Sequence, residues 1–200
     1  MNEPSMVILG VDPGTLVTGY GVVERKNGKF RVLEHSFVKN RSTASMPLRL
    51  KAIFAALCAV IERHQPDEFA IETAFYGKNA QSALKIGHAR GVSILAAVNY
   101  EIPTAEYSPR EVKKAVVGNG AASKEQVQFM VKSILGLRTT PKFHDVSDAL
   151  AVALCHYQRR GKPRGGWRES TKRTTKQSRS KTQSQWAAFI QEHPERVRNK

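Results

Sequence analysis

Residues 7–38, VILGVDPGTLVTGYGVVERKNGKFRVLEHSFV, set the architecture of the chain. The apolar run that ends in the D-P-G turn at 12–14 is typical of a buried strand, and residues 19–24 and 30–38 predict two further strands. A Lys-Asn-Gly sequence at 26–28 supplies the turn chemistry of a hairpin between those two strands. The stretch therefore predicts a meander of three strands.

Downstream of the meander, helix and strand patterns alternate. They predict, in order, a helix at 46–64, a strand at 69–73, a helix at 79–100, a strand at 102–107 and helices that begin near 108, 123 and 144. A Ser-Pro pair opens the helix at 108, and Ser123 with Gln126 forms a capping box for the next one. This order predicts an α/β fold, with a five-stranded mixed sheet and helices on both faces.

The composition is that of one folded domain followed by a basic tail. With 200 residues and 40% hydrophobic content, the chain can bury one ordinary core. We expect an N-terminal extension at 1–5, a single domain at 6–158 and a basic, disordered tail at 159–200, where the apolar pattern stops. The cysteines, Cys58 and Cys155, lie in apolar helical patterns and are expected to be free thiols.

The net charge of +15 points to an anionic partner. Residues 161–200 alone hold 11 Lys+Arg and 3 Asp+Glu, so the positive charge belongs partly to the tail and partly to the folded body. Such a balance favours association with nucleic acid or with a membrane surface. No apolar run approaches the roughly 20 residues of a membrane span, and the first residues lack a signal-peptide pattern, so we expect a cytoplasmic protein.

Four acids stand where strands end or a helix begins. Asp12 ends the first strand and Glu72 the fourth; if these strands are parallel neighbours, both acids lie at the carboxyl edge of the sheet. In HDVSDALAVAL, residues 144–154, Asp145 and Asp148 are three apart and project from one face of the last helix. Converging carboxylates repel one another unless cations lie among them. Two Mg²⁺ ions about 3.5–4 Å apart would also hold the attacking water and the leaving oxygen of a phosphodiester in line.

Each of these acids also has an ordinary structural interpretation. Asp12 can form the D-P-G turn, and Glu72 can be a solvated strand end. The pair Asp145 and Asp148 can cap the last helix or complement its dipole. His144 can be a capping residue, a residue at the edge of the core or a proton carrier in catalysis. The coincidence of all four acids favours the metal site over independent structural roles.

Four blocks of the sequence resemble the RuvC family of Holliday-junction resolvases, in the same order and with similar spacing. Within residues 6–158 these blocks are VDPGTLVTGYGVV, AIETAFYGKNAQSALKIGHARG, SPREVKKAVVGNGAASKEQV and HDVSDALAVAL. The resemblance implies a ribonuclease-H-like fold, a homodimer and a Mg²⁺-dependent endonuclease. Such an enzyme makes paired symmetric nicks in four-way DNA junctions during recombination and repair, leaving 5′-phosphate and 3′-hydroxyl ends. Mn²⁺ is expected to substitute for Mg²⁺, and the branch-migration proteins RuvA and RuvB are implied as partners.

The resemblance also implies roles for individual residues. It places the catalytic, metal-binding acids at the four positions already singled out: Asp12, Glu72, Asp145 and Asp148. Phe75 matches the aromatic residue that the family stacks on a junction base, and anchoring of its loop is the alternative. Some relatives carry His where this chain has Asp145, so either Asp145 or His144 can be the residue that reaches a metal.

Several basic residues are candidate DNA contacts. Lys113 and Lys124 match family residues near the scissile phosphate. By charge and location, Lys78, Arg90 and Lys114 are further candidates, and for each of them an ordinary solvated position is the alternative.

Two other functions fit parts of the sequence. The D-x-G turn followed by GYG resembles the phosphate-binding hairpin of actin-like ATPases and sugar kinases, but the chain is short for their two lobes and lacks their second phosphate loop. A basic junction-binding protein without catalytic activity would show steep salt dependence and no Mg²⁺-dependent cutting. The small residues of the helix at 79–100, among them Ala89, Gly91 and Ser93, suit a dimer interface or tight packing on the sheet.

Overall fold

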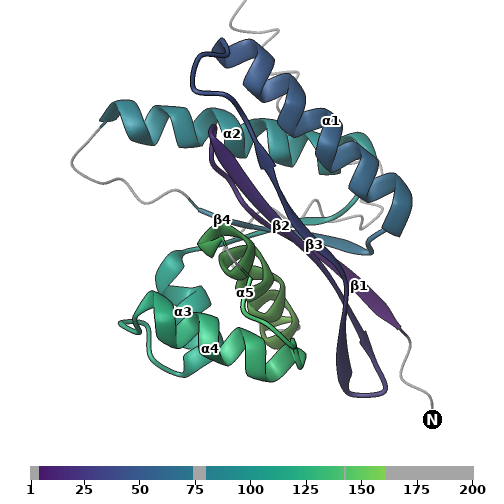
Figure 1. The fold of residues 1–200 in the computed structure, drawn as a ribbon. Helices are drawn as coiled ribbons and strands as arrows, with labels where there is room; N and C mark the ends of the chain where they lie inside the picture. Colours follow the sequence, from purple (N-terminus) through teal and green to yellow (C-terminus); the bar gives the residue numbers. More distant parts are fainter. Residues whose placement is uncertain (1–4, 74–79, 142, 161–200) are drawn as a thin grey trace, which may run out of the picture. The chain divides into compact units, whose positions relative to one another are not determined.

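The computed structural model describes residues 5–73, 80–141 and 143–160. In chain order they form β1 (Met6–Asp12), β2 (Val17–Lys26), β3 (Lys29–Lys39), α1 (Met46–His64), β4 (Glu68–Glu72), α2 (Ala80–Asn99), β5 (Thr104–Tyr107), α3 (Pro109–Val117), α4 (Lys124–Leu135) and α5 (His144–Arg159) (Figure 1). The predicted order of strands and helices is confirmed.

The strands form one mixed sheet of five strands in the order β3-β2-β1-β4-β5. The first three strands pair antiparallel, whereas β4 pairs parallel with both β1 and β5. The hairpin between β2 and β3 turns at Asn27 and Gly28, with φ of 49° and 75°. Two consecutive positive φ angles match the twist of a tight hairpin, and Asn-Gly is the pair that adopts them most readily. The predicted meander and mixed sheet are confirmed.

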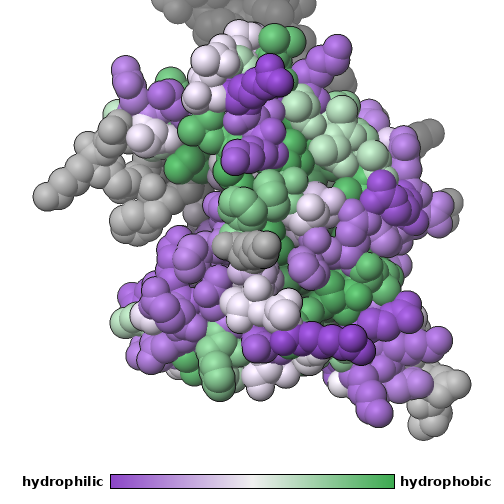
Figure 2. Space-filling model, in the orientation of Figure 1, coloured by the Kyte–Doolittle hydropathy of each residue, from purple (hydrophilic) through white to green (hydrophobic). Residues whose placement is uncertain are grey.

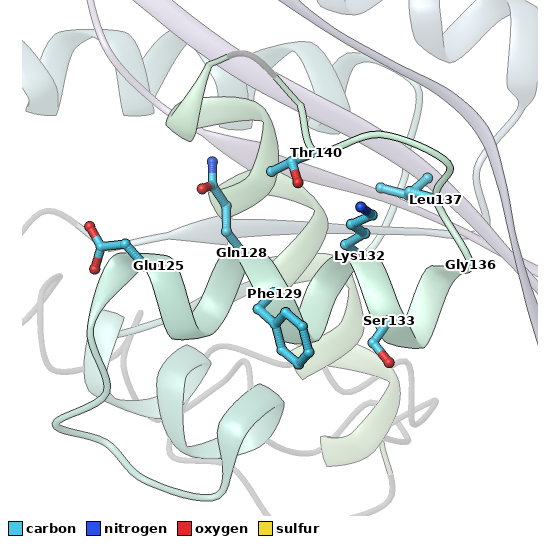
Figure 3. A pocket seen from close by; sticks show the side chains of 8 residues that line it. All are labelled: Glu125, Gln128, Phe129, Lys132, Ser133, Gly136, Leu137 and Thr140. Atoms are coloured by element: carbon cyan, nitrogen blue, oxygen red, sulfur yellow. The ribbon is translucent and has the colours of Figure 1, made fainter.

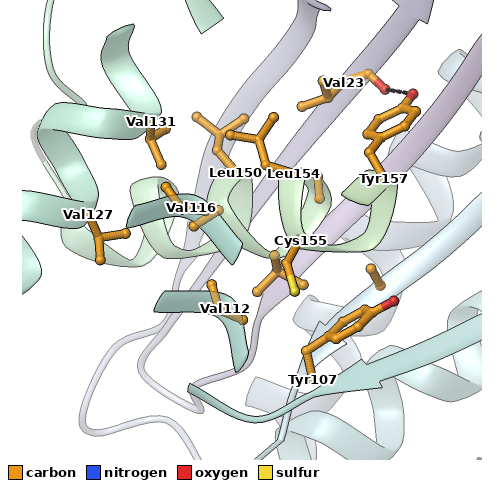
Figure 4. Packing of buried hydrophobic residues seen from close by; sticks show 14 of the residues in the cluster. Val23, Tyr107, Val112, Val116, Val127, Val131, Leu150, Leu154, Cys155 and Tyr157 are labelled. Carbon is orange, nitrogen blue, oxygen red and sulfur yellow. Dashed lines mark hydrogen bonds between the residues drawn. The ribbon is translucent and has the colours of Figure 1, made fainter. Parts of the chain in front are cut away.

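Helices cover both faces of the sheet, as predicted. Figure 1 shows α1 and α2 on one face and α3, α4 and α5 on the other. Each face has its own buried cluster, one built around Leu9, Leu57 and Ile71 and one around Leu150 and Leu154. Figure 4 shows the second cluster, in which side chains of α3, α4 and α5 meet those of the strands. In the same view the Tyr157 hydroxyl donates a 3.1 Å hydrogen bond to the Val23 carbonyl.

The central helix α5 lies unusually close to β1 and β2 because glycines face it. A Cβ atom added at Gly10 would be 2.2 Å from the Ala149 carbonyl oxygen, and one at Gly21 would be 2.4 Å from the Leu150 side chain. At Gly19 it would be 2.0 Å from the carbonyl oxygen of Asp145. Any larger residue at these positions would collide with the helix, since packed carbon and oxygen atoms do not approach below about 3 Å. The glycines of β1 and β2 therefore set the depth at which α5 sits.

Some predicted boundaries differ from the observed ones. β2 begins at Val17 instead of residue 19, because Val17 pairs with Lys39 across the sheet. β5 begins at Thr104, after Pro103, whose carbonyl accepts a 2.9 Å hydrogen bond from the Phe69 amide. α5 ends at Arg159; the expected domain at 6–158 and the tail at 159–200 stay predictions, since residues 161–200 lie outside the described residues.

Two further sequence expectations concern thiols and membranes. Both cysteines are free, Cys155 being buried and Cys58 partly buried. Among the helices that the structure describes, none is long and apolar enough to cross a membrane.

Candidate active site

The first two acids lie at the carboxyl ends of the two central parallel strands. Asp12 is the last residue of β1 and Glu72 the last residue of β4. The parallel register pairs Val11 with Ile71, which brings the next residue of each strand to the same sheet edge. Asp12 and Glu72 share a side-chain hydrogen bond. Strand pairing alone therefore places these two carboxyl groups in contact.

The other two acids come from the start of α5. The residue that caps this helix is Phe143, with no side-chain hydrogen bond to the helix terminus. The Phe143 ring packs against Phe37 of β3, with ring centroids 4.1 Å apart. Asp145 lies in the first turn and Asp148 in the next, so neither one caps the helix. The capping interpretation of this pair is not supported, although Asp145 still complements the helix dipole.

Gly19 links Asp12 to the start of α5. It is the residue of β2 that pairs directly with Asp12 in the antiparallel register. Its missing side chain leaves room for the Asp145 backbone, as shown by the 2.0 Å approach of a hypothetical Cβ atom to that carbonyl oxygen. Sequence reasoning missed this role, and the signal was the GYG sequence inside a strand, where glycine is otherwise unfavourable.

The four acids are close enough to interact electrostatically. Burial and then the negative charges of Glu72, Asp148 and Asp145 raise the pKa of Asp12 well above its ordinary value. These three acids come from β4 and α5, far from Asp12 in the sequence. The structure therefore brings all four predicted acids into one site.

Two lysines partly offset this negative charge. Burial and the neighbouring Asp148 raise the pKa of Glu72 to about 7, although Lys124 and Lys113 act in the opposite direction. The Lys124 ammonium is 3.6 Å from an oxygen of Asp148. Burial raises the pKa of Asp148 as well, against the opposing effect of Lys124. Lys113 and Lys124 thus lie beside the acids.

The four carboxylates are the candidate donor set for a metal ion. As the side chains stand in the described ranges, no three His, Cys, Asp or Glu residues are arranged to hold an ion. The chemistry of the donors nevertheless fits a hard divalent cation, because all four are carboxylates and carboxylate oxygen is the preferred ligand of Mg²⁺. Burial and the neighbouring negative charges raise the pKa of Asp12, and a bound cation would offset that repulsion and favour the ionised carboxylates.

Of the remaining predicted site residues, three lie within the described residues and two lie outside them. Arg90, on α2, forms a salt bridge with Glu106 of β5. Lys114 is exposed on α3, and His144 is exposed at the start of α5, where its charge lowers the pKa of Asp148. Phe75 and Lys78 lie outside the residues that the structure describes.

A separate concavity of about 540 Å³ lies on α4. Its walls come from α4 and the loop that follows, as Figure 3 shows, and they include Phe129, a residue that is 70% exposed. None of the predicted site residues lines it. We therefore assign the candidate active site to the acids and not to this concavity.

Fold and site together define a class of protein. The sheet order, the helices on both faces and the acids at the ends of β1 and β4 and on α5 are those of a ribonuclease-H-like α/β protein. Clustered carboxylates of this kind are used in metal-assisted phosphodiester chemistry.

Comparisons with known proteins identify the family. The family model described as crossover junction endodeoxyribonuclease RuvC matches residues 8–156. The RuvC of Desulforamulus reducens is 50% identical over 153 residues, which cover 76% of this chain and 94% of the relative. The RuvC of Salinibacter ruber is 44% identical over 192 residues, 96% of this chain and 99% of the relative.

A solved structure supports the same assignment. Thermus thermophilus RuvC in complex with a Holliday junction substrate has a TM-score of 0.73 and 38% sequence identity, covering 77% of this chain and 95% of that one. The chain belongs to the RuvC family of crossover junction endodeoxyribonucleases.

Proposed function

We propose that this chain is a Holliday-junction resolvase, an endonuclease that uses Asp12, Glu72, Asp145 and Asp148 to bind divalent metal ions. The observation that carries the proposal is the convergence of these four acids from three separate elements, with two lysines beside them. Membership of the RuvC family supports the substrate and the reaction. The family assignment favours neither an actin-like ATPase nor a non-catalytic binding module.

The acids and the lysines of the site have different proposed roles. The four carboxylates would hold two Mg²⁺ ions, with Mn²⁺ able to substitute, and bound metal would supply an activated water and stabilise charge on the phosphate. Lys113 and Lys124 lie next to the acids and supply positive charge where a scissile phosphate would lie. The expected products carry 5′-phosphate and 3′-hydroxyl ends, which a ligase can rejoin.

Paired symmetric nicks require two copies of this site, so we propose a homodimer. One face of α2, including Ala89 and Ser93, is buried within the fold, where α2 packs mainly against α1, and this supports the packing interpretation for those small residues. The opposite face exposes Leu84, Leu95 and Val98, with 62%, 56% and 54% of each residue accessible. The spacing of these three matches the apolar seam of paired helices. We assign this exposed face of α2 to the dimer contact.

The remaining proposals rest on the family for Phe75, RuvA and RuvB, on charge and location for Lys78, and on the sequence pattern for the cytoplasmic location. Phe75 and Lys78 are proposed to contact the junction, Phe75 by stacking on a base. The branch-migration proteins RuvA and RuvB are the proposed partners, and the cytoplasm the proposed location.

A cleavage assay tests the function. A labelled four-way junction and a linear duplex of the same sequence are incubated with the protein in Mg²⁺ or EDTA, and the products are resolved on a denaturing gel. We expect paired nicks that require both the junction and the metal, and their loss in Asp12→Asn. Cutting of both substrates alike, or cutting in EDTA, would contradict the proposal.

A further inference from the structure

A second concave surface, apart from the four acids, is strongly basic. It has a volume of about 740 Å³ and lies between α3, the loop after α3 and the end of α5. Its charged residues are Arg110, Lys114, Arg159 and a single acid, Glu111. We call these four residues and the loop 118–121 the α3 pocket.

The single acid of the α3 pocket is already engaged within the fold. One Glu111 oxygen pairs with Arg159 of α5. The other accepts hydrogen bonds from the backbone and the hydroxyl of Ser108, at 2.9 and 2.8 Å, as part of the capping box of α3. Among the described acids, none pairs with Arg110 or Lys114. The pocket therefore presents uncompensated positive charge.

The loop fixes the position of Arg110. A Cβ atom at Gly120 would lie 2.7 Å from the Arg110 side chain and 3.2 Å from its carbonyl oxygen, so only glycine allows this approach. The loop thereby packs along the Arg110 side chain as far as Nε, while the residue as a whole stays exposed. A planar guanidinium held in this way suits bidentate binding of a phosphate.

The same helix serves the active site. Lys113 of α3 lies close enough to the acids to lower the pKa of Glu72. Arg110 and Lys114 lie one turn apart on a neighbouring face of the same helix. A DNA strand that places one phosphate at the acids and Lys113 has its neighbouring phosphates on either side of that point, and α3 lies on one of these sides. The surface over α3 and the loop that follows it is mostly hydrophilic in Figure 2. From Arg160, next to the pocket residue Arg159, the chain continues into residues 161–200, with 11 Lys+Arg.

We propose that the α3 pocket binds backbone phosphates of the DNA arm next to the cleavage site. This inference rests on the proposed function for the identity of the DNA but concerns a separate contact. The contact reads no bases, because its ligands are phosphates. It positions an arm of the junction so that the scissile phosphate lies at the acids.

The test measures how DNA binding depends on salt. Arg110→Gln/Lys114→Gln is compared with Lys29→Gln/Lys51→Gln, which removes the same charge from two exposed lysines on the β2–β3 hairpin and on α1. All proteins carry Asp12→Asn to prevent cutting, and thermal unfolding confirms that they are folded. Binding to a fluorescent junction and to a linear duplex is measured between 50 and 200 mM KCl.

Each phosphate contact contributes a slope of about 0.9 in a plot of log K against log salt concentration. We expect the α3-pocket variant to lose about two contacts, that is, a slope shallower by about 1.8, on both DNAs, while the control changes by a smaller amount. Equal slopes for the two variants would overturn the proposal.

The outcomes also separate this proposal from the proposed function. If the parent protein cuts junctions but the slopes of the two variants are equal, the α3 pocket is wrong and the nuclease assignment stands. If the slopes of the two variants on duplex DNA differ as predicted but the parent protein cuts no DNA, the pocket stands and the nuclease assignment fails. If no DNA binds at any salt concentration, both are wrong.

Discussion

Replacing Gly19 by alanine should impair catalysis far more than it impairs folding. The new Cβ atom would be 2.0 Å from the Asp145 carbonyl oxygen, 2.3 Å from its carbonyl carbon and 2.8 Å from the Val146 nitrogen. All three atoms belong to the backbone of the first turn of α5, which cannot rotate away as a side chain can. To reach the 3.4 Å at which ordinary contact begins, the start of α5 must therefore move by roughly 1.4 Å.

That movement displaces Asp145 and Asp148 relative to Asp12 and Glu72. A shift of about 1 Å in a catalytic group costs on the order of 10²-fold in rate, whereas overpacking of a core costs about 1–3 kcal/mol of folding free energy. We therefore expect Gly19→Ala to remain folded at 25 °C, with a lower Tm, and to cut junctions on the order of 100-fold more slowly under single-turnover conditions.

Gly21 provides the matched control. It lies on the same strand and face, but a Cβ atom there would clash with the Leu150 side chain, at 2.4 Å, and meet the helix backbone only at an ordinary contact distance of 3.6 Å. A flexible side chain can adjust, so Gly21→Ala should lose stability with much less loss of rate. The reasoning is refuted if Gly19→Ala cuts within threefold of the parent, or if both variants slow cleavage equally.

Three further predictions concern pH and assembly. With EDTA present, Tm should fall as pH rises from 4.5 to about 7, because Glu72 binds its proton more tightly in the folded protein than in the unfolded chain. At pH values above 7, added Mg²⁺ should raise Tm. A flat pH profile that Glu72→Gln leaves unchanged would count against the acid cluster. Burial raises the pKa of Glu34, but hydrogen bonds from a histidine, a tyrosine and an arginine outweigh it and lower the pKa to about 2. The stability that these bonds provide is lost as pH falls from 4.5 to about 2. Glu34→Gln should lower the free energy of unfolding, measured in urea at pH 7, by about 1–3 kcal/mol. A change near zero would contradict this prediction. Leu95→Glu, on the exposed face of α2, should convert the proposed dimer to a monomer in sedimentation velocity without lowering Tm by more than a few degrees. An unchanged sedimentation coefficient would exclude this face.

Local patterns were enough to predict the elements of the sheet and the acids. Alternating apolar residues, the Asn27-Gly28 turn and the capping box at Ser123 are each determined within a few residues, and the structure contains all of them. The position of Asp12 and Glu72 at one sheet edge followed from a parallel crossover, which needs only strand order.

The features that the sequence did not predict depend on contacts between distant segments. The role of Gly19 arises because β2 pairs with β1 and packs under α5; the GYG sequence marks an unusual strand position but does not show which segment packs there. The start of β2 at Val17 depends on pairing with Lys39. The α3 pocket likewise joins α3 to Arg159, at the far end of the domain sequence.

The central claim is that the four acids together form a metal site, and anomalous diffraction from crystals soaked in Mn²⁺ tests it most directly. We predict two anomalous peaks per chain bounded by Asp12, Glu72, Asp145 and Asp148, with loss of at least one peak in Asp12→Asn. Peaks elsewhere on the chain, or none at a Mn²⁺ concentration that supports junction cleavage, would contradict the claim.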